Sequence, residues 1–276
     1  MTDYSAWIGK SDYQSDMITQ SLVDRYRAVI GSDDMGGNIP YGLHWCTCLP
    51  KAPMTELAQD GHPKTGGFLP ASQLPRRMWA SSKINFLRPI RIGAKIDRHS
   101  KIKSVTAKQG RSGPLLFVEV EHIIEADREE SIGETQTIVY RDVSTSKAKL
   151  PIAKAFSLDD WSETKKVIPT PALLFRYSAL TFNTHRIHYD QVYASDVEGY
   201  PALVVHGPLM ASLLLNFATE LADSTSITHF QFRGLSPAYC NQELTLVANT
   251  KSDEIDLAIM GLDGTKIMAA KAAVKV

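Results

Sequence analysis

The chain has 276 residues, of which 43% are apolar and 22% charged, a balance that is typical of a soluble globular protein. Lysine plus arginine and aspartate plus glutamate both number 30, so the formal net charge is zero. This balance argues against a nucleic-acid-binding protein, which needs a basic face, and no stretch reaches the ~18 apolar residues that a membrane span requires. We therefore expect neither a nucleic acid nor a membrane as partner.

The N-terminal segment MTDYSAWIGKSDYQSD carries acidic residues and no apolar core, so it does not resemble a signal peptide. An odd and low number of cysteines, Cys46, Cys48 and Cys240, fits a reducing compartment, and together these features predict a cytoplasmic protein. Cys46 and Cys48 could bind a metal, but no second ligand pair with zinc spacing follows them. The alternative is that they are buried as small apolar residues, and we expect no metal site.

The two halves of the chain echo each other. Residues 144–164 are polar and lysine-rich without periodicity, which predicts a linker between a domain at 1–143 and a domain at 165–276. RYRAV at 25–29 matches RYSAL at 176–180, and INFLRP at 84–89 resembles FQFR at 230–233. Expected strands follow in the same order, at 95–106, 115–125 and 135–140 and again at 243–250, 255–260 and 266–274. This order indicates a tandem duplication of one α+β unit.

Two helices are expected in the second half. Thr170 and Pro171 form a helix-start signal, and Leu173, Leu174, Tyr177 and Leu180 follow at helical spacing, although Leu-Leu-Phe is also compatible with a strand. Residues 207–222 predict a clearer helix that is apolar on nearly all sides. A central helix enclosed by a curved antiparallel sheet satisfies that pattern.

Polar groups are concentrated in TFNTHRIHYD, residues 181–190, just before this central helix. This motif, with GYP at 199–201 and VVHGPLMASLLL at 204–215, resembles the MaoC-like, R-specific enoyl-CoA hydratases and 3-hydroxyacyl-thioester dehydratases. PRRMWASSKINFLRPIRIG, GRSGPLLFVEVEH and QTIVYR in the first half resemble a tandem branch of that family that includes mesaconyl-CoA (methylfumaryl-CoA) hydratases. The resemblance implies a double hot-dog fold, in which each unit has an antiparallel sheet wrapped around a helix.

Hydration of an α,β-unsaturated thioester needs a base for water, an acid for the α-carbon and a donor for the thioester oxygen. His188 can serve as base and then acid, because the ordinary pKa of histidine lies near neutral pH. Gly207 opens the central helix, where free backbone N–H groups and the positive end of the helix dipole can bind an oxyanion. Glycine also lets the ligand approach the backbone closely.

Asn183 departs from the resemblance, since most of the family carries an aspartate five residues before the catalytic histidine. An amide does not ionise, so Asn183 cannot be a base, but it can orient the attacking water. We therefore expect a mechanism with one base, in which His188 acts on water that Asn183 holds. The alternative is a site that has lost activity and only binds acyl thioesters.

Six further residues are candidates for substrate binding, each with a structural alternative: His185, Arg186, His206, Arg76, Arg77 and Arg88. The arginines could bind a substrate carboxylate or CoA phosphates, or could be ordinary surface charges. His185 could contact the ligand or hydrogen-bond the local backbone. His206 could contact the ligand or be a buried, hydrogen-bonded histidine.

The sequence thus predicts a hydratase or dehydratase of CoA thioesters, with no cofactor and with a branched dicarboxylic substrate such as mesaconyl-CoA as one candidate. The first half lacks the motif, because the offset of the repeat aligns His188 with Gly37, and we expect it to be non-catalytic and to shape the substrate site. A fatty-acyl-type dehydratase remains an alternative. A thioesterase is another, but its acid would have to be Glu220, about three turns from Gly207. We expect a homodimer or a higher homo-oligomer.

Overall fold

The computed structural model describes residues 3–110, 113–142, 148–222 and 226–275. Its helices are α1 (Gln20–Ile30), α2 (Pro171–Thr181) and α3 (Gly207–Leu221). Its strands in the first half are β1 (Ser11–Met17), β2 (Arg76–Phe86), β3 (Lys95–Gly110), β4 (Gly113–Ala126) and β5 (Glu129–Arg141). Those in the second half are β6 (Glu163–Val167), β7 (Ile227–Gly234), β8 (Leu244–Thr250), β9 (Glu254–Gly261) and β10 (Lys266–Val274).

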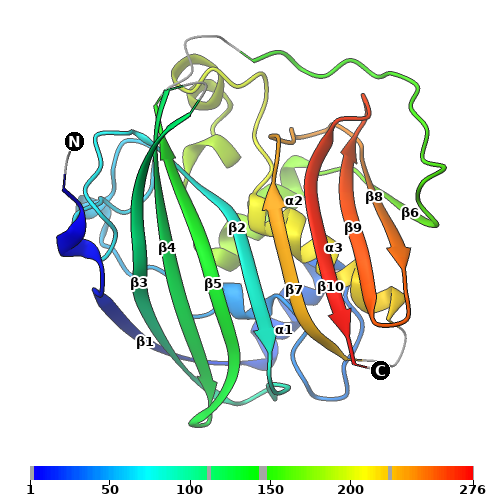
Figure 1. Ribbon diagram of the computed structural model, residues 1–276, viewed down its shortest axis with the longest axis horizontal. Helices are drawn as coiled ribbons and strands as arrows, with labels where there is room; N and C mark the ends of the chain where they lie inside the picture. Colours follow the sequence, from blue (N-terminus) through cyan, green and yellow to red (C-terminus); the bar gives the residue numbers. More distant parts are fainter. Residues whose placement is uncertain (1–2, 111–112, 143–147, 223–225, 276) are drawn as a thin grey trace.

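All ten strands belong to one antiparallel sheet in the order β1-β3-β4-β5-β2-β7-β10-β9-β8-β6 (Figure 1). The first and second halves of the chain therefore contribute adjacent halves of the sheet. They meet where β2 pairs with β7, with Ile84 opposite Phe230 and both side chains fully buried. β2 ends with the residues INF of the INFLRP segment and β7 carries FQFR, so the repeated elements themselves form the join.

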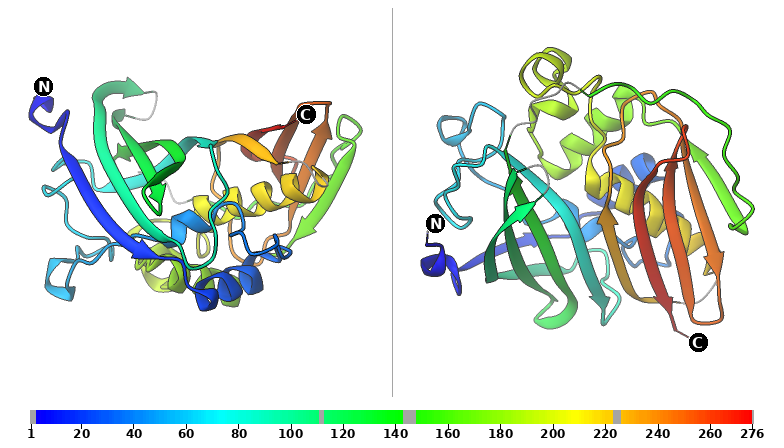
Figure 2. Two further views of the ribbon diagram at one scale, coloured as in Figure 1. Left: turned by 90° about the horizontal axis from the view of Figure 1, so that it is seen from below. Right: turned by 45° about the horizontal axis from the view of Figure 1, so that its top comes forward.

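The central helix α3 lies against the concave side of the second half of the sheet, as Figure 2 shows from below. Nine of its residues are buried, among them Leu213, Leu214 and Phe217, which confirms the prediction of a helix enclosed on nearly all sides. Pro208 stands in its first turn, where the missing N–H costs no intrahelical bond.

The helix at α2 is also confirmed. Thr170 caps it by accepting a hydrogen bond from the backbone N–H of Leu173, and the chain leaves the helix at Phe182 in the left-handed conformation. α1 lies at the position that the repeat assigns to α2 and packs against it. Both helices and α3 share one hydrophobic core.

The first half differs from the second because its described residues contain no long helix in the place of α3. Between α1 and β2 the helical structure is limited to the short 3-10 helices Leu43–Cys46 and Met54–Glu56. Prolines at 53, 63, 70 and 75 interrupt this segment, so it cannot continue as an α-helix. The concave face of β2 to β5 is therefore covered by loops.

Residues 144–147 of the expected linker lie outside the described residues, and residues 148–162 contain no helix or strand. Its last two residues are the first of β6, which starts at Glu163. Within the part of the chain that the structure describes, no helix combines the length and apolar character needed to cross a bilayer.

Candidate active site

A cavity of about 940 Å³ lies between the two halves of the chain. Strands β2 to β5 form one wall, and the loop that follows α2 and the first turn of α3 form another. The predicted residues Asn183, His185, His188 and Gly207 all line it. The motif of the second half therefore opens into a space that the first half encloses.

His188 stands at the end of a single 3-10 turn, Arg186–His188, and its side chain is almost fully buried. Its Nδ1 lies 2.7 Å from the carbonyl oxygen of Val204, so Nδ1–H donates and Nε2 keeps its lone pair. Burial lowers the pKa of His188 to about 4, so the ring is neutral near pH 7. A neutral imidazole with one free ring nitrogen is equipped to be a general base.

His206 holds the ring of His188 in place. The two rings stack with centroids 3.6 Å apart, and His206 Nε2 lies 2.8 Å from the hydroxyl of Ser178. His206 is fully buried and does not line the cavity, and burial lowers its pKa well below the ordinary value. Of its two expected roles, the structure places it as the buried, hydrogen-bonded histidine.

Gly207 is the first residue of α3 and lines the cavity. Its backbone N–H is among those at the helix start that have no intrahelical partner. A methyl group added at this position would meet only the carbonyl oxygen of Trp79, at 3.5 Å. The backbone is therefore open to a ligand oxygen from the cavity side.

Asn183 and His185 are fixed relative to each other, because Asn183 Oδ1 accepts a hydrogen bond of 2.9 Å from the backbone N–H of His185. This leaves the amide nitrogen of Asn183 as its donor toward the cavity. The ring of His185 lies edge-on to that of His188, with centroids 5.4 Å apart. Burial, followed by the charges of His62 and His188, lowers the pKa of His185 far below the ordinary value.

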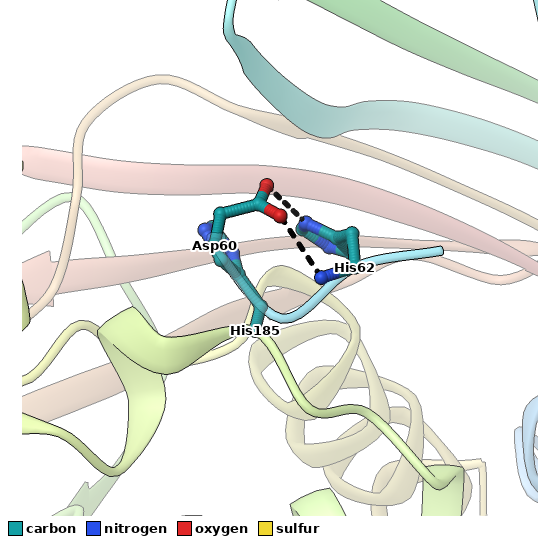
Figure 3. A group of neighbouring side chains, drawn as sticks. All are labelled: Asp60, His62 and His185. Carbon is teal, nitrogen blue, oxygen red and sulfur yellow. Dashed lines mark hydrogen bonds and ion pairs between the residues drawn. The ribbon is translucent and has the colours of Figure 1, made fainter. Parts of the chain in front are cut away.

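Asp60 and His62 belong to the same cluster and were not expected from the sequence. Figure 3 shows them with His185, and the rings of His62 and His185 lie 4.1 Å apart. Both residues come from the loop before β2, in a Pro- and Gly-rich segment that carries no recognised motif. The sequence signal for this pair is an acid two residues before a histidine, in Asp60-Gly61-His62. The offset of the repeat instead aligned the catalytic motif with residues 32–37, which contain no histidine.

The predicted arginines have different surroundings. Arg77 lines the cavity and makes no ion pair with any residue that the structure describes. Arg76 is buried in an ion pair with Glu198, at 2.6 Å. Arg186 does not line the cavity and pairs with Asp190 at 2.8 Å. Arg88 lies outside the cavity and pairs with Glu129 at an exposed position, so Arg77 is the arginine best placed for a ligand anion.

The wall formed by β2 to β5 also carries polar groups that the sequence reasoning missed. Glu134 is buried and accepts hydrogen bonds from Trp45 and from Ser82. Burial would raise the pKa of Glu134, but His44 at 3.5 Å and Ser82 outweigh it and hold the pKa below the ordinary value. His122 lies beside it on β4 and contacts Ser100 and Gln136. The far side of the cavity therefore combines this polar cluster with apolar residues such as Val120, Ile124 and Ile138.

Two remaining expectations concern the cysteines and Glu220. Cys46, Cys48 and Cys240 are buried free thiols, and burial raises the pKa of Cys46 to about 12.

Glu220 pairs with Lys165 at 2.7 Å and does not line the cavity. A thioesterase mechanism based on Glu220 therefore has no support from its position.

Comparisons with known proteins indicate the family of the chain. Residues 42–240 match the model of the family described as hydroxyacyl-thioester dehydratase type 2. The chain is 41% identical to mesaconyl-C(4)-CoA hydratase of Chloroflexus aurantiacus, over 97% of this chain and 96% of that protein. It is 26% identical to the mitochondrial hydroxyacyl-thioester dehydratase type 2 of Schizosaccharomyces pombe, over 92% of this chain and 95% of that protein.

Solved structures with the same fold include HtdX of Mycobacterium tuberculosis, with a TM-score of 0.72 and 16% identity over 96% of this chain and all of that one. A MaoC-like dehydratase from Phytophthora capsici gives a TM-score of 0.70 and 14% identity over 97% of this chain and 96% of that one. These likenesses confirm the predicted double hot-dog arrangement. The chain belongs to the hydroxyacyl-thioester dehydratase type 2 family and is a hydro-lyase of the MaoC-like hydratase and dehydratase class.

Proposed function

We propose that the enzyme hydrates a branched, dicarboxylic enoyl-CoA thioester of the mesaconyl-C4-CoA type. The observation that carries the reaction is the pairing, in one cavity, of a neutral His188 with the open helix start at Gly207. The observation that favours this acyl group is the 41% identity to a hydratase of that name along almost the whole chain.

In the proposed reaction, water lies against Nε2 of His188 and is oriented by the amide nitrogen of Asn183. His188 accepts a proton from the water as the oxygen bonds to the β-carbon. The thioester oxygen gains negative charge and accepts a hydrogen bond from the N–H of Gly207, an interaction worth ~3–4 kcal/mol in comparable oxyanion sites. A proton then reaches the α-carbon and restores the thioester carbonyl.

The proposed substrate has a free carboxylate and a methyl group on the β-carbon, close to the reacting water. Arg77 is suited to that carboxylate, because it lines the cavity without an ion pair among the described residues. Burial is the main cause of the lowered pKa values of His62 and His185, and the charge of Arg77 adds to both, so it acts on the same space. A guanidinium can bind a carboxylate through two parallel hydrogen bonds.

A fatty-acyl-type dehydratase is the second candidate, and the extent of the cavity along β2 to β5 favours it. The polar groups at Glu134 and His122 on that wall favour a short or polar acyl group instead. We further propose that the reaction needs neither metal nor redox cofactor, since it consists of proton transfer and charge stabilisation. A cytoplasmic location and a homo-oligomeric state stay predictions from the sequence.

The test is loss of enoyl-thioester absorbance with mesaconyl-C4-CoA and crotonyl-CoA, using the wild-type protein beside His188→Ala. We expect turnover that falls by ~10²–10⁴-fold in the variant, the usual contribution of a general base. Unchanged turnover in the variant would remove His188 from the mechanism. Tight thioester binding by a wild type without turnover would identify an inactive binding protein, with Asn183 as the lost carboxylate.

A further inference from the structure

The loop that carries Asp60 and His62 is built against the motif of the second half. The backbone N–H of Arg186 donates to the carbonyl oxygen of Asp60 at 2.8 Å, and the hydroxyl of Thr184 donates to the carbonyl oxygen of Gly61. Gly61 has a φ of +91°, and a methyl group there would lie 1.9 Å from the carbonyl oxygen of Thr184. Only glycine fits this contact, so the loop is fixed on the reaction site.

Within the loop, Asp60 holds His62 by two hydrogen bonds. Its Oδ2 lies 2.9 Å from Nδ1 of His62, and its Oδ1 accepts from the backbone N–H of His62 at 3.0 Å (Figure 3). This pairing directs Nδ1–H toward the carboxylate and leaves Nε2 of His62 free. His62 lines the cavity, and its side chain keeps 20% of its surface exposed.

His62 is distinguished from the other histidines around the cavity motif by this carboxylate. Burial lowers the pKa of His62, as it lowers those of His185, His188 and His206, but the hydrogen bond and charge of Asp60 oppose this shift at His62. Among the described residues, no acid hydrogen-bonds to the other three histidines, so a proton entering the cluster is best stabilised on His62. The ring of His185 lies between those of His62 and His188, at 4.1 and 5.4 Å. Burial is the main cause of the lowered pKa of His188, and a positive charge on His62 would lower it further.

We propose that Asp60 and His62 are a second acid–base pair of this active site, in which His62 exchanges the proton of the α-carbon and Asp60 positions and polarises its ring. This inference rests on the proposed hydratase function. It replaces the expectation of a non-catalytic first half, because the carboxylate that is missing at Asn183 is then supplied from the other half of the chain.

The protons of the reaction balance as follows. Neutral His188 takes a proton from water as the C–O bond forms at the β-carbon, and the electron pair of the C=C bond moves to the thioester oxygen. Protonated His62 then gives its Nε2 proton to the α-carbon as the carbonyl re-forms. The proton left on His188 returns to His62 through water in the cavity, which restores the starting state.

The experiment compares His62→Gln and Asp60→Asn with wild type and with His99→Gln, a control on the exposed side of β3. Both mesaconyl-C4-CoA and crotonyl-CoA are used, because crotonyl-CoA has no free carboxylate. We expect His62→Gln to lower kcat on both substrates by ~10²-fold or more with little change in KM, as for loss of a general acid. Asp60→Asn should also lower kcat, by up to ~10⁴-fold as for loss of the carboxylate that orients a catalytic histidine, because the ring of His62 remains but its proton is less stabilised.

Two readouts separate proton transfer from a structural role. Exchange of the α-proton of the hydroxyacyl product with deuterated water should be lost in His62→Gln. In Asp60→Asn the limb of the kcat–pH profile that reports the acid should move to lower pH, because the carboxylate that raises the pKa of His62 is lost. Burial and the charge of Arg77 continue to lower that pKa, and the ring of His185 also faces His62. Asp60→Asn keeps an oxygen for the backbone N–H of His62, so this variant is expected to fold.

The possible outcomes decide between the ideas. Full kcat in His62→Gln on both substrates overturns the second pair, while collapse in His188→Ala still supports the hydratase. A loss confined to mesaconyl-C4-CoA, seen as a raised KM, makes His62 a carboxylate-binding residue instead. Stoichiometric zinc that is lost in both variants, and whose removal stops turnover, makes Asp60, His62 and His185 a metal site and overturns proton transfer by His62. An inactive wild type contradicts the proposed function itself.

Discussion

Replacing Gly207 by alanine tests the proposed oxyanion site without disturbing the fold. The nearest protein atom to the new methyl group is the carbonyl oxygen of Trp79 at 3.5 Å, an ordinary van der Waals distance. Alanine is also favoured over glycine within a helix by up to ~1 kcal/mol. We therefore expect the melting temperature of Gly207→Ala to stay the same or to rise slightly.

The effect on catalysis should be large, because the methyl group occupies the space through which the thioester oxygen approaches the helix start. Loss of one oxyanion donor typically costs ~10²–10³-fold in kcat, or about 3–4 kcal/mol. The new methyl group leaves the N–H in place but displaces the ligand oxygen, so we expect the lower end, a fall of ~10²-fold in kcat/KM.

The assay is steady-state hydration of an enoyl-CoA followed by absorbance, with thermal unfolding measured on the same preparations. Gly234→Ala is the matched control, because Gly234 also lines the cavity and a methyl group there would meet only the carbonyl oxygen of Ala80, at 3.7 Å. It should keep nearly all activity. If Gly207→Ala kept kcat/KM within about threefold of wild type, the thioester oxygen would not bind at the start of α3.

Further predictions concern pH, charge and metals. Because burial lowers the pKa of His188 to about 4, kcat/KM should persist to about pH 5 and fall as the base is protonated below that; an acid limb near pH 6.5 would contradict the buried, neutral ring. Below about pH 6.5 the unfolded chain binds a proton at His188, while the folded ring stays neutral down to about pH 4. Acidification from pH 6.5 to 4 should therefore lower the free energy of unfolding by at most about 3 kcal/mol through this residue. In urea, the free energy of unfolding of His188→Ala should depend less on pH than that of wild type. Arg77→Gln should raise KM for mesaconyl-C4-CoA by ~10–10²-fold, the range for one lost charged hydrogen-bonding partner, and leave crotonyl-CoA unchanged, whereas Arg88→Gln should affect neither. Dialysis against a chelator should leave turnover unchanged, and activity restored only by added zinc would refute a metal-free reaction.

Much of the fold was predictable because its signals are local. The apolar surface of α3, the cap at Thr170 and the turn residues between strands each specify structure over a few neighbouring residues. The pairing of β2 with β7 joins residues that are 146 positions apart, such as Ile84 and Phe230. No local sequence pattern predicts such a pairing. The weak repeat indicated the pairing of β2 with β7 only indirectly, since copies of one unit tend to meet about a symmetry axis.

The missing central helix of the first half has a cause that is visible in the sequence. Prolines and glycines at 53, 61, 63, 66, 67, 70 and 75 exclude a long helix there. The repeat nevertheless led to the expectation of a helix in each unit. Because the described segment 53–75 contains no long helix, there is room for the cavity against β2 to β5 and for the loop that carries Asp60.

The candidate site was predictable only where its residues are close in sequence. His188, Asn183 and Gly207 lie within 25 residues of one another, and their chemistry can be recognised from type and spacing. His62 is 126 positions from His188, in the half whose aligned position holds Gly37. Aligning the two halves does not identify His62, because it does not lie at the position equivalent to His188. It lies in the loop before β2, in the half whose described residues contain no long central helix. The tight contact of Gly61 with Thr184 is what brings that place to the motif, so substitutions at Gly61 should impair turnover through the position of His62 even where the motif itself is intact.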